Sequence, residues 1–182
     1  LPENQIIGSG TILDTARLRY GLSEHFKVAQ GNIHAYVFGE HGDTSFIPWT
    51  GAYISGLSTD EYYEEMKAHG KDVKPLDKEA MLEYVQKSGG KVIAKKGATF
   101  YAVSATVCQL VGLILAASDS LATVSSMLHG EYGIEDVCLS TLTLVGPNGT
   151  QGKVQMRMNK EEVALLKKSA DALKEVIAQI EL

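Results

Sequence analysis

Cysteine is scarce in this sequence, with only Cys108 and Cys138 among 182 residues. Both lie in apolar segments, which predicts reduced core residues and no disulfide framework, as is usual for a cytoplasmic protein. A basic stripe, which nucleic-acid-binding proteins usually carry, is also missing from a chain with 17 basic and 22 acidic residues. No secretory signal peptide is visible. These absences predict a cytoplasmic chain that binds no nucleic acid.

Long apolar runs are rare as well. Residues 97–121 form the one segment apolar and long enough to compare with a membrane span, which needs about 20 residues. This segment carries polar side chains, among them Gln109 and Asp119, and nothing else in the chain resembles a span. We therefore expect a helix buried against the core or against another subunit, and no membrane partner.

Two glycine-containing runs fall short of nucleotide-binding motifs. The run 8–10, Gly-Ser-Gly, lacks the third glycine of a dinucleotide fingerprint, and no βαβ pattern follows it. The run 89–91, Gly-Gly-Lys, lacks both the Walker spacing and the hydroxyl residue after the lysine. The sequence therefore predicts neither a Rossmann turn nor a P-loop in this chain.

Length and hydrophobic patterning define the expected fold. The length falls in the usual one-domain range of about 100–200 residues, and 45% of the residues are apolar. Periodicity, caps and turn signals predict helices at 11–27, 58–67, 78–87, 91–118 with a kink at Gly97, and 159 onward, and strands at 32–38, 46–54, 122–130, 137–145 and 153–158. Together they predict a single α+β domain over residues 1–182, with long helices packed on a mostly antiparallel sheet.

A histidine, His41, ends a strand-like run and stands between the glycines at 39 and 42. Glycine has no Cβ, so the backbone can turn sharply there and a substrate can approach closely. Imidazole has an unperturbed pKa near ~6.5 and can exchange a proton near neutrality. The run indicates either a proton-transfer site or a solvated histidine in a surface turn.

The first predicted helix supplies partners for such a histidine. Asp14 and Arg17 are three residues apart and share a face, and Thr11 with Asp14 resembles a helix-capping pair. A carboxylate can hold a histidine in one tautomer, and a guanidinium fork can bind a substrate carboxylate through two hydrogen bonds. The alternatives are a first-turn aspartate favoured by the helix dipole and an arginine on a solvated face. Arg19 lies roughly 200° around the helix from Arg17 and faces another side.

Two motifs together resemble one protein family. The run 8–19, GSGTILDTARLR, followed by the run 39–44, GEHGDT, closely resembles the C-terminal half of the L-lactate dehydrogenases, and malate dehydrogenases are more distant cousins. A third run, 96–102, KGATFYA, resembles the substrate-pocket helix of that family. The resemblance extends from the first residue to the last.

The resemblance implies a role for each motif residue. His41 is similar to the proton donor and acceptor, Asp14 to its partner, and Arg17 to the residue that binds the substrate carboxylate. Thr99 is similar to the pocket residue that faces the small side chain of the substrate, which favours pyruvate and lactate. The alternative for Thr99 is a helix-interior hydroxyl that bonds to the preceding turn.

An effector site is a second implication. Many bacterial lactate dehydrogenases bind fructose 1,6-bisphosphate at a subunit interface, and the arginine and histidine for that effector match Arg19 and His34. The alternative is an exposed arginine and a strand-end histidine that are simply solvated. A zinc site from His34, His41 and Asp43 matches no common ligand spacing, so no metal is expected.

The N-terminal half of the family is missing from this sequence. The Rossmann domain with its glycine-rich turn, the acidic ribose ligand and the mobile loop with a second arginine have no counterpart here. The NAD site is therefore expected mostly outside the chain, and the chain alone is expected to be inactive. Three functions remain open: one half of an L-lactate dehydrogenase, one half of a malate or other 2-hydroxy acid dehydrogenase, and a non-catalytic oligomerisation and effector-binding module. A homo-oligomer, by family analogy a tetramer, is expected.

Overall fold

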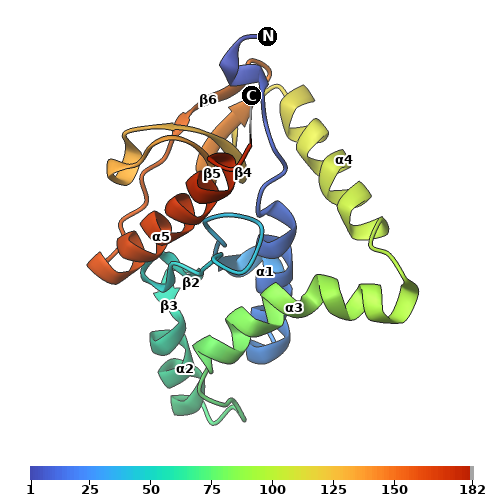
Figure 1. Cartoon of the computed structure of the whole chain (residues 1–182). Coiled ribbons are helices and arrows are strands. Elements are labelled where there is room, and N and C mark those ends of the chain that lie inside the picture. The colour runs from blue at the N-terminus through green and yellow to red at the C-terminus, as the bar shows by residue number, and fades with distance from the viewer. Residues whose placement is uncertain (181–182) are drawn as a thin grey trace.

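The structure is a computed structural model that describes residues 1–180 of the chain (Figure 1). Its helices and strands alternate irregularly along the chain, as an α+β fold requires. The helices are α1 (Ile12–Phe26), α2 (Thr59–Ala68), α3 (Lys78–Lys96), α4 (Tyr101–Leu115) and α5 (Lys160–Ile177). The strands are β1 (Ile33–His34), β2 (Tyr53–Ile54), β3 (Leu57–Ser58), β4 (Ser120–His129), β5 (Glu135–Gly146) and β6 (Gly149–Lys153).

The larger sheet is antiparallel, in the order β4-β5-β6. Its β4–β5 ladder pairs Ser120 with Val145 at one end and His129 with Glu135 at the other. Helix α5 packs on this sheet, and Leu166 is fully buried among residues that include Leu128 and Leu139. The start of α5 is fixed by a capping box between Asn159 and Glu162, in agreement with the helix predicted from residue 159 onward.

A second, smaller antiparallel sheet joins the short strands β1, β2 and β3. Its core is shared with α1, whose predicted apolar row at i, i+4 and i+8 is buried as Leu18, Leu22 and Phe26. A capping box between Ser58 and Glu61 starts α2, in agreement with the helix predicted at 58–67. The α+β class and the antiparallel pairing are confirmed, although the described strands form two sheets and not one.

The long helical region divides elsewhere than the sequence predicted. The glycines at 89 and 90 were expected to interrupt a helix, but α3 runs through them from Lys78 to Lys96. At Gly97 the backbone adopts a left-handed conformation with φ of 75°, which ends α3 and does not kink it. A separate helix, α4, follows α3. The connection between the two helices forms a corner at the side of the molecule (Figure 1).

Three other expectations are corrected. Residues 32–38 and 46–54 form only short strands joined by bridges and turns, because the smaller sheet has two-residue ladders. The third strand of the larger sheet begins at Gly149 and ends at Lys153, so the predicted strand 153–158 lies too late. Both cysteines are free, and both are exposed in this chain, so neither is a core residue here.

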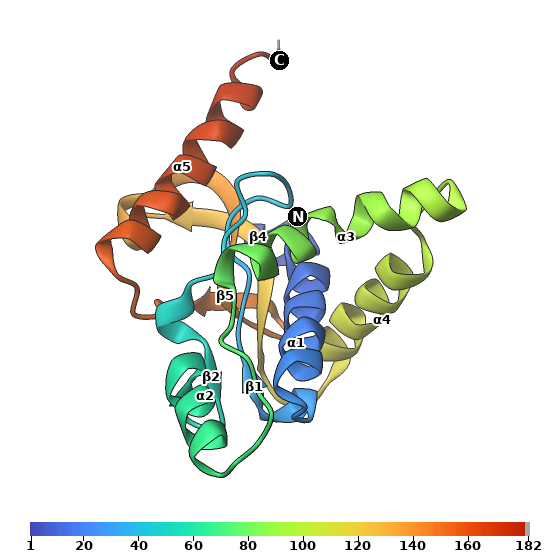
Figure 2. The same ribbon diagram turned by 90° about the horizontal axis from the view of Figure 1, so that it is seen from below.

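Helix α4 lies along the edge of the molecule, with α3 next to it in the chain (Figure 2). Only Thr106 and Leu110 of α4 are buried. None of the helices among residues 1–180 combines the length and the apolarity that a membrane crossing requires. Helix α4 is therefore buried against the rest of this chain only along the narrow stripe that contains these two residues.

Candidate active site

The first turn of α1 positions the carboxylate of Asp14. The predicted capping pair does not form, because the hydroxyl of Thr11 donates to the backbone carbonyl of Val37. The Asp14 carboxylate is thereby left to side-chain partners, although the residue is only 4% exposed. Its Oδ1 accepts from Nη1 of Arg17 at 3.1 Å, one helical turn further along. The predicted shared face of these two residues is confirmed.

His41 reaches the same carboxylate from a tight turn. Phe38 and Phe46 exchange two backbone hydrogen bonds at the base of this turn, at 2.9 and 3.0 Å. Gly39 adopts a φ of 98°, which a residue with a Cβ rarely accepts. The Nδ1 atom of His41 donates to Oδ2 of Asp14 at 2.6 Å. This bond fixes the tautomer, and Nε2 has no hydrogen-bond partner among residues 1–180, so it can bond a group in the cavity.

The electrostatics of the pair favour a protonated imidazole. The hydrogen bond that His41 donates to Asp14 is the main cause that raises the pKa of His41 above 6.5, and the charge of Asp14 adds to it. Burial and the nearby charge of Arg17 act in the opposite direction. A buried carboxylate that accepts one bond from an imidazole and one from a guanidinium can stabilise an imidazolium during proton transfer.

The residues predicted for catalysis and substrate binding line one cavity of about 250 Å³. Asp14 and Arg17 come from α1, His41 from the turn, and Thr99 from the connection between α3 and α4. Thr99 is not inside a helix, so the helix-interior alternative does not apply. A proton donor, a guanidinium and a small side chain therefore face the same cavity. The other residues that line it are Leu13, Gly42, Asp43, Ser45, Gln86, Gly89, Gly90, Ile93 and Val103.

Helix α3 contributes a wall that the sequence did not predict. Gln86 lines the cavity and donates to backbone carbonyls in the histidine turn. A Cβ built on Gly89 would lie 3.8 Å from Nη2 of Arg17, so this part of α3 faces the guanidinium. The signal present in the sequence was a helical pattern that continued through two glycines, but it was interpreted as a break.

Arg19 lies on another side of α1, as predicted. Its Nε donates to the carbonyl of Ala35 at 3.1 Å, and its guanidinium carbon lies 5.1 Å from the ring centroid of Tyr36. His34 is exposed on β1, next to Ala35 in the chain. In the structure, Arg19 and His34 therefore lie on neighbouring segments, and neither residue lines the His41 cavity.

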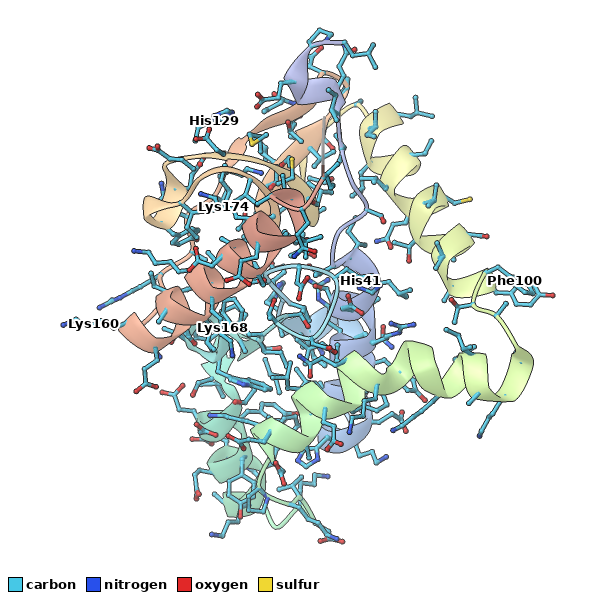
Figure 3. The ribbon with its side chains drawn as sticks, viewed as in Figure 1. His41, Phe100, His129, Lys160, Lys168 and Lys174 are labelled. Carbon is cyan, nitrogen blue, oxygen red and sulfur yellow. The ribbon has the colours of Figure 1, made fainter. Side chains whose placement is uncertain are left out.

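The remaining histidines have local partners. His25 contacts the carbonyl of Lys74, His69 contacts the carbonyl of Glu65, and His129 pairs with Glu3 at 2.6 Å. His129 lies at the end of β4, far from His41 in Figure 3. Within residues 1–180, no three histidine, cysteine, aspartate or glutamate side chains gather closely enough to hold a metal ion.

This geometry agrees with what comparison with known families finds. Residues 11–181 match the family described as lactate/malate dehydrogenase, alpha/beta C-terminal domain. The chain belongs to this family. The match begins at the helix with Asp14 and Arg17 and includes the turn with His41 and the connection with Thr99. The resemblance inferred from the three sequence runs is confirmed.

Relatives and solved structures indicate the same family. The chain is 44% identical to the L-lactate dehydrogenase of Acetivibrio thermocellus and 42% identical to L-lactate dehydrogenase 1 of Clostridium acetobutylicum, covering 100% and 98% of this chain. Each match covers 56% of the relative, so the chain spans about half the length of these relatives. A minor L-lactate dehydrogenase from Enterococcus mundtii, solved in a ligand-bound form, superposes with a TM-score of 0.90 at 30% identity and covers 100% of this chain and 57% of that one.

The glycine turn at residues 8–10 does not have the setting of a dinucleotide-binding βαβ unit, because a short 3₁₀ helix (Glu3–Gln5) and no parallel strand precedes it. A Cβ built on Gly10 would lie 2.5 Å from Oγ of Ser140 and 2.6 Å from the backbone nitrogen of Ser125. Gly8 is bridged to Ser125 through backbone hydrogen bonds of 2.9 and 3.0 Å. One side of the turn therefore packs closely on β4 and β5. Gly8, Ser9 and Gly10 also line, together with His41, an open hollow of about 380 Å³ on this chain.

Proposed function

We propose that this chain is the substrate-binding and proton-transfer part of an NAD-dependent L-lactate dehydrogenase, which converts pyruvate and NADH to L-lactate and NAD. The observation that carries the proposal is the 2.6 Å bond between His41 and Asp14 in the cavity that Arg17 and Thr99 also line. These residue types suit a small acid with an oxygen on the α-carbon. The family membership and the names of the relatives support the same activity.

Each residue has one task in this proposal. Arg17 binds the substrate carboxylate through its guanidinium fork. Protonated His41 gives the proton on Nε2 to the carbonyl oxygen as hydride reaches the α-carbon, and the reverse reaction returns it. Asp14 orients the ring and stabilises the imidazolium. Thr99 faces the methyl group of pyruvate.

The hydride comes from a nicotinamide cofactor that this chain does not hold by itself. We propose that the NAD site is supplied by a polypeptide equivalent to the part of the relatives that this chain does not match. We also propose that the 182-residue chain alone has no turnover. The test adds the dinucleotide-binding part of the Acetivibrio thermocellus relative to this chain and follows NADH absorbance with pyruvate. NADH consumption that requires both components supports the proposal, and no consumption at any ratio of the two contradicts it.

Two variants on one helix make this test specific. Arg17→Gln should raise the KM for pyruvate about 100-fold, because a charge-assisted pair to the carboxylate is lost. Arg19→Gln, two residues further along, should leave the KM unchanged because Arg19 faces Ala35 and Tyr36. Replacing pyruvate by oxaloacetate tests the malate alternative. Faster turnover of oxaloacetate would overturn the assignment of Thr99 to a methyl-sized substrate.

A second candidate function is effector binding with assembly and without chemistry. Arg19 and His34 favour it, because both lie away from the catalytic cavity on neighbouring parts of the fold. Such paired cations from two subunits would bind the two phosphates of fructose 1,6-bisphosphate and would repel each other without it.

The complete enzyme is proposed to be a cytoplasmic homotetramer of glycolysis and pyruvate fermentation.

The effector proposal is tested by calorimetric titration of fructose 1,6-bisphosphate into the chain, with light scattering for mass. Binding heat together with a doubled or quadrupled mass, lost in Arg19→Gln and kept in Arg17→Gln, supports an effector site. Effector-dependent assembly without turnover after any complementation would favour the non-catalytic module. An absence of heat in the wild-type chain contradicts effector binding by these residues.

A further inference from the structure

The turn that carries His41 is attached to α3 through one side chain, Gln86. The amide nitrogen of Gln86 lies 2.9 Å from the carbonyl of Ser45, 3.2 Å from the carbonyl of Asp43 and 3.3 Å from Oγ of Ser45. Ser45 in turn donates through Oγ to the carbonyl of Gly42 at 2.8 Å. A single amide on α3 therefore holds the chain segment that directly follows the histidine.

The opposite side of the turn is held by α5. The buried hydroxyl of Ser169 accepts from the backbone nitrogen of Glu40 at 2.8 Å and from Oγ1 of Thr44 at 2.9 Å. The carboxylate of Glu40 accepts from the backbone nitrogen of Thr44 at 3.1 Å. Residues 40 and 44 thus face α5, and residues 43 and 45 face α3. Loss of the α3 contact leaves the segment 43–45 without its helix partner, while α5, the Phe38–Phe46 pair and Asp14 still hold the rest of the turn.

The imidazole depends on this support. The side chain of His41 is 63% exposed, and its one hydrogen bond in the described chain is the bond to Asp14. A ring with so little packing takes its position from its backbone. One turn beyond Gln86, Gly89 approaches the guanidinium of Arg17. The same stretch of α3 therefore borders both the proton-transfer group and the carboxylate-binding group.

We propose that Gln86 is a positioning residue that fixes the His41 turn against α3, so that His41 and Arg17 keep the separation that one substrate requires. This inference rests on the proposed dehydrogenase function. Within the described residues, the hydrogen bonds of the Gln86 side chain go to Asp43 and Ser45 and not to the imidazole. Its contribution lies in the backbone of residues 43–45, and displacement of a reacting group by about 1 Å can cost roughly 100-fold in rate.

The test compares three variants within one turn of α3. Gln86→Met keeps the length and helix propensity of the side chain but removes the donor. Gln86→Lys restores a donor that reaches the same carbonyls. Lys87→Met is the matched control, because Lys87 is exposed and pairs with Glu83 on its own helix. Thermal unfolding of all three shows whether the fold is kept.

Two readouts separate this inference from the proposed function. Amide hydrogen exchange of residues 44–46 in the 182-residue chain should become at least tenfold faster in Gln86→Met, unchanged in Lys87→Met and restored in Gln86→Lys. In the complemented enzyme, Gln86→Met should lower kcat about 10- to 100-fold and leave KM within twofold, because Arg17 still binds the carboxylate. Unchanged exchange overturns the inference whether or not the enzyme turns over. Faster exchange with an unchanged kcat in an active enzyme overturns it as well.

Discussion

Helices α1 and α4 have the same length, 15 residues, but differ in how the chain covers them. Helix α1 mixes polar and apolar residues, and its apolar row is buried in the core around Leu18 and Leu22. Helix α4 is apolar on nearly all sides, yet most of its large side chains are exposed, namely Tyr101, Val103, Val107, Val111 and Leu115. Apolar composition therefore does not by itself place a helix in the core of this chain.

The difference matters for the site because α1 carries its charged groups. A helix fixed along one face presents its other residues in defined directions, so Asp14 and Arg17 enter the cavity and Arg19 does not. Helix α4 begins just after Thr99, at the cavity edge. The cavity thus lies between α1, which is anchored in a core, and the start of α4, which is buried only along one narrow stripe.

The largest expected effect comes from the buried carboxylate on α1. Asp14→Asn keeps the shape of the side chain but removes the charge that orients and stabilises the imidazolium. In the complemented enzyme we expect kcat to fall about 10⁴-fold, as for the aspartate of a hydrolytic triad. Glu24→Gln on the same helix is the control, because Glu24 is exposed and pairs only with Lys27. A loss below tenfold would show that Asp14 is not the partner of His41 in catalysis.

The same variant makes a pH prediction. Asp14 raises the pKa of His41 in the folded chain above 6.5, so the pair stabilises the fold fully below the unfolded pKa. This contribution is lost as the pH rises through the folded pKa. In Asp14→Asn the pKa of His41 should fall. The extra stability of the wild type over Asp14→Asn should be largest at mildly acidic pH and should decrease as the pH is raised to alkaline values. Imidazole NMR titration and urea unfolding across this range measure both effects.

The core of α1 gives the next largest effect. Leu18 is fully buried, so Leu18→Ala should lower the free energy of unfolding by about 3 kcal/mol through lost burial and a residual cavity. Urea unfolding followed by circular dichroism measures this change. A loss under about 1 kcal/mol would mean that the α1 core relaxes to fill the space, and that α1 is held no more firmly than α4.

The sequence predicted α1 and α5 well because each has a regular apolar row, and Asn159 with Glu162 marks the start of α5. Asp14, Arg17, His41 and Thr99 could be chosen as candidates because local runs carry them, and the structure places all four around one cavity; their roles stay predictions. The connection between α3 and α4 was placed wrongly, since glycine inside a helix costs only about 1 kcal/mol and does not mark an end by itself. Gln86 was missed because its contacts cross 41 and 43 residues of sequence, and no local pattern encodes them.

The junction of α3 and α4 can be tested with two glycines. Gly97 has a positive φ and open space around it, so Gly97→Ala should cost about 1 kcal/mol from backbone strain alone. Gly90 lies inside α3, also with open space around it, so Gly90→Ala should raise stability by roughly 0.5–1 kcal/mol. Equal effects from both substitutions, measured by urea unfolding, would argue against a helix end at Gly97.

The smallest expected effect tests the exposed side of α4 with the substitution already used in α1. Leu115 is 79% exposed, so Leu115→Ala should change the free energy of unfolding by no more than about 0.5 kcal/mol. Identical chemistry in Leu18→Ala then isolates burial as the cause of the difference. A loss above about 1 kcal/mol that grows with protein concentration would show that a second copy covers α4 in solution, since association then contributes to apparent stability. The same loss at every concentration would place Leu115 in contact with its own chain.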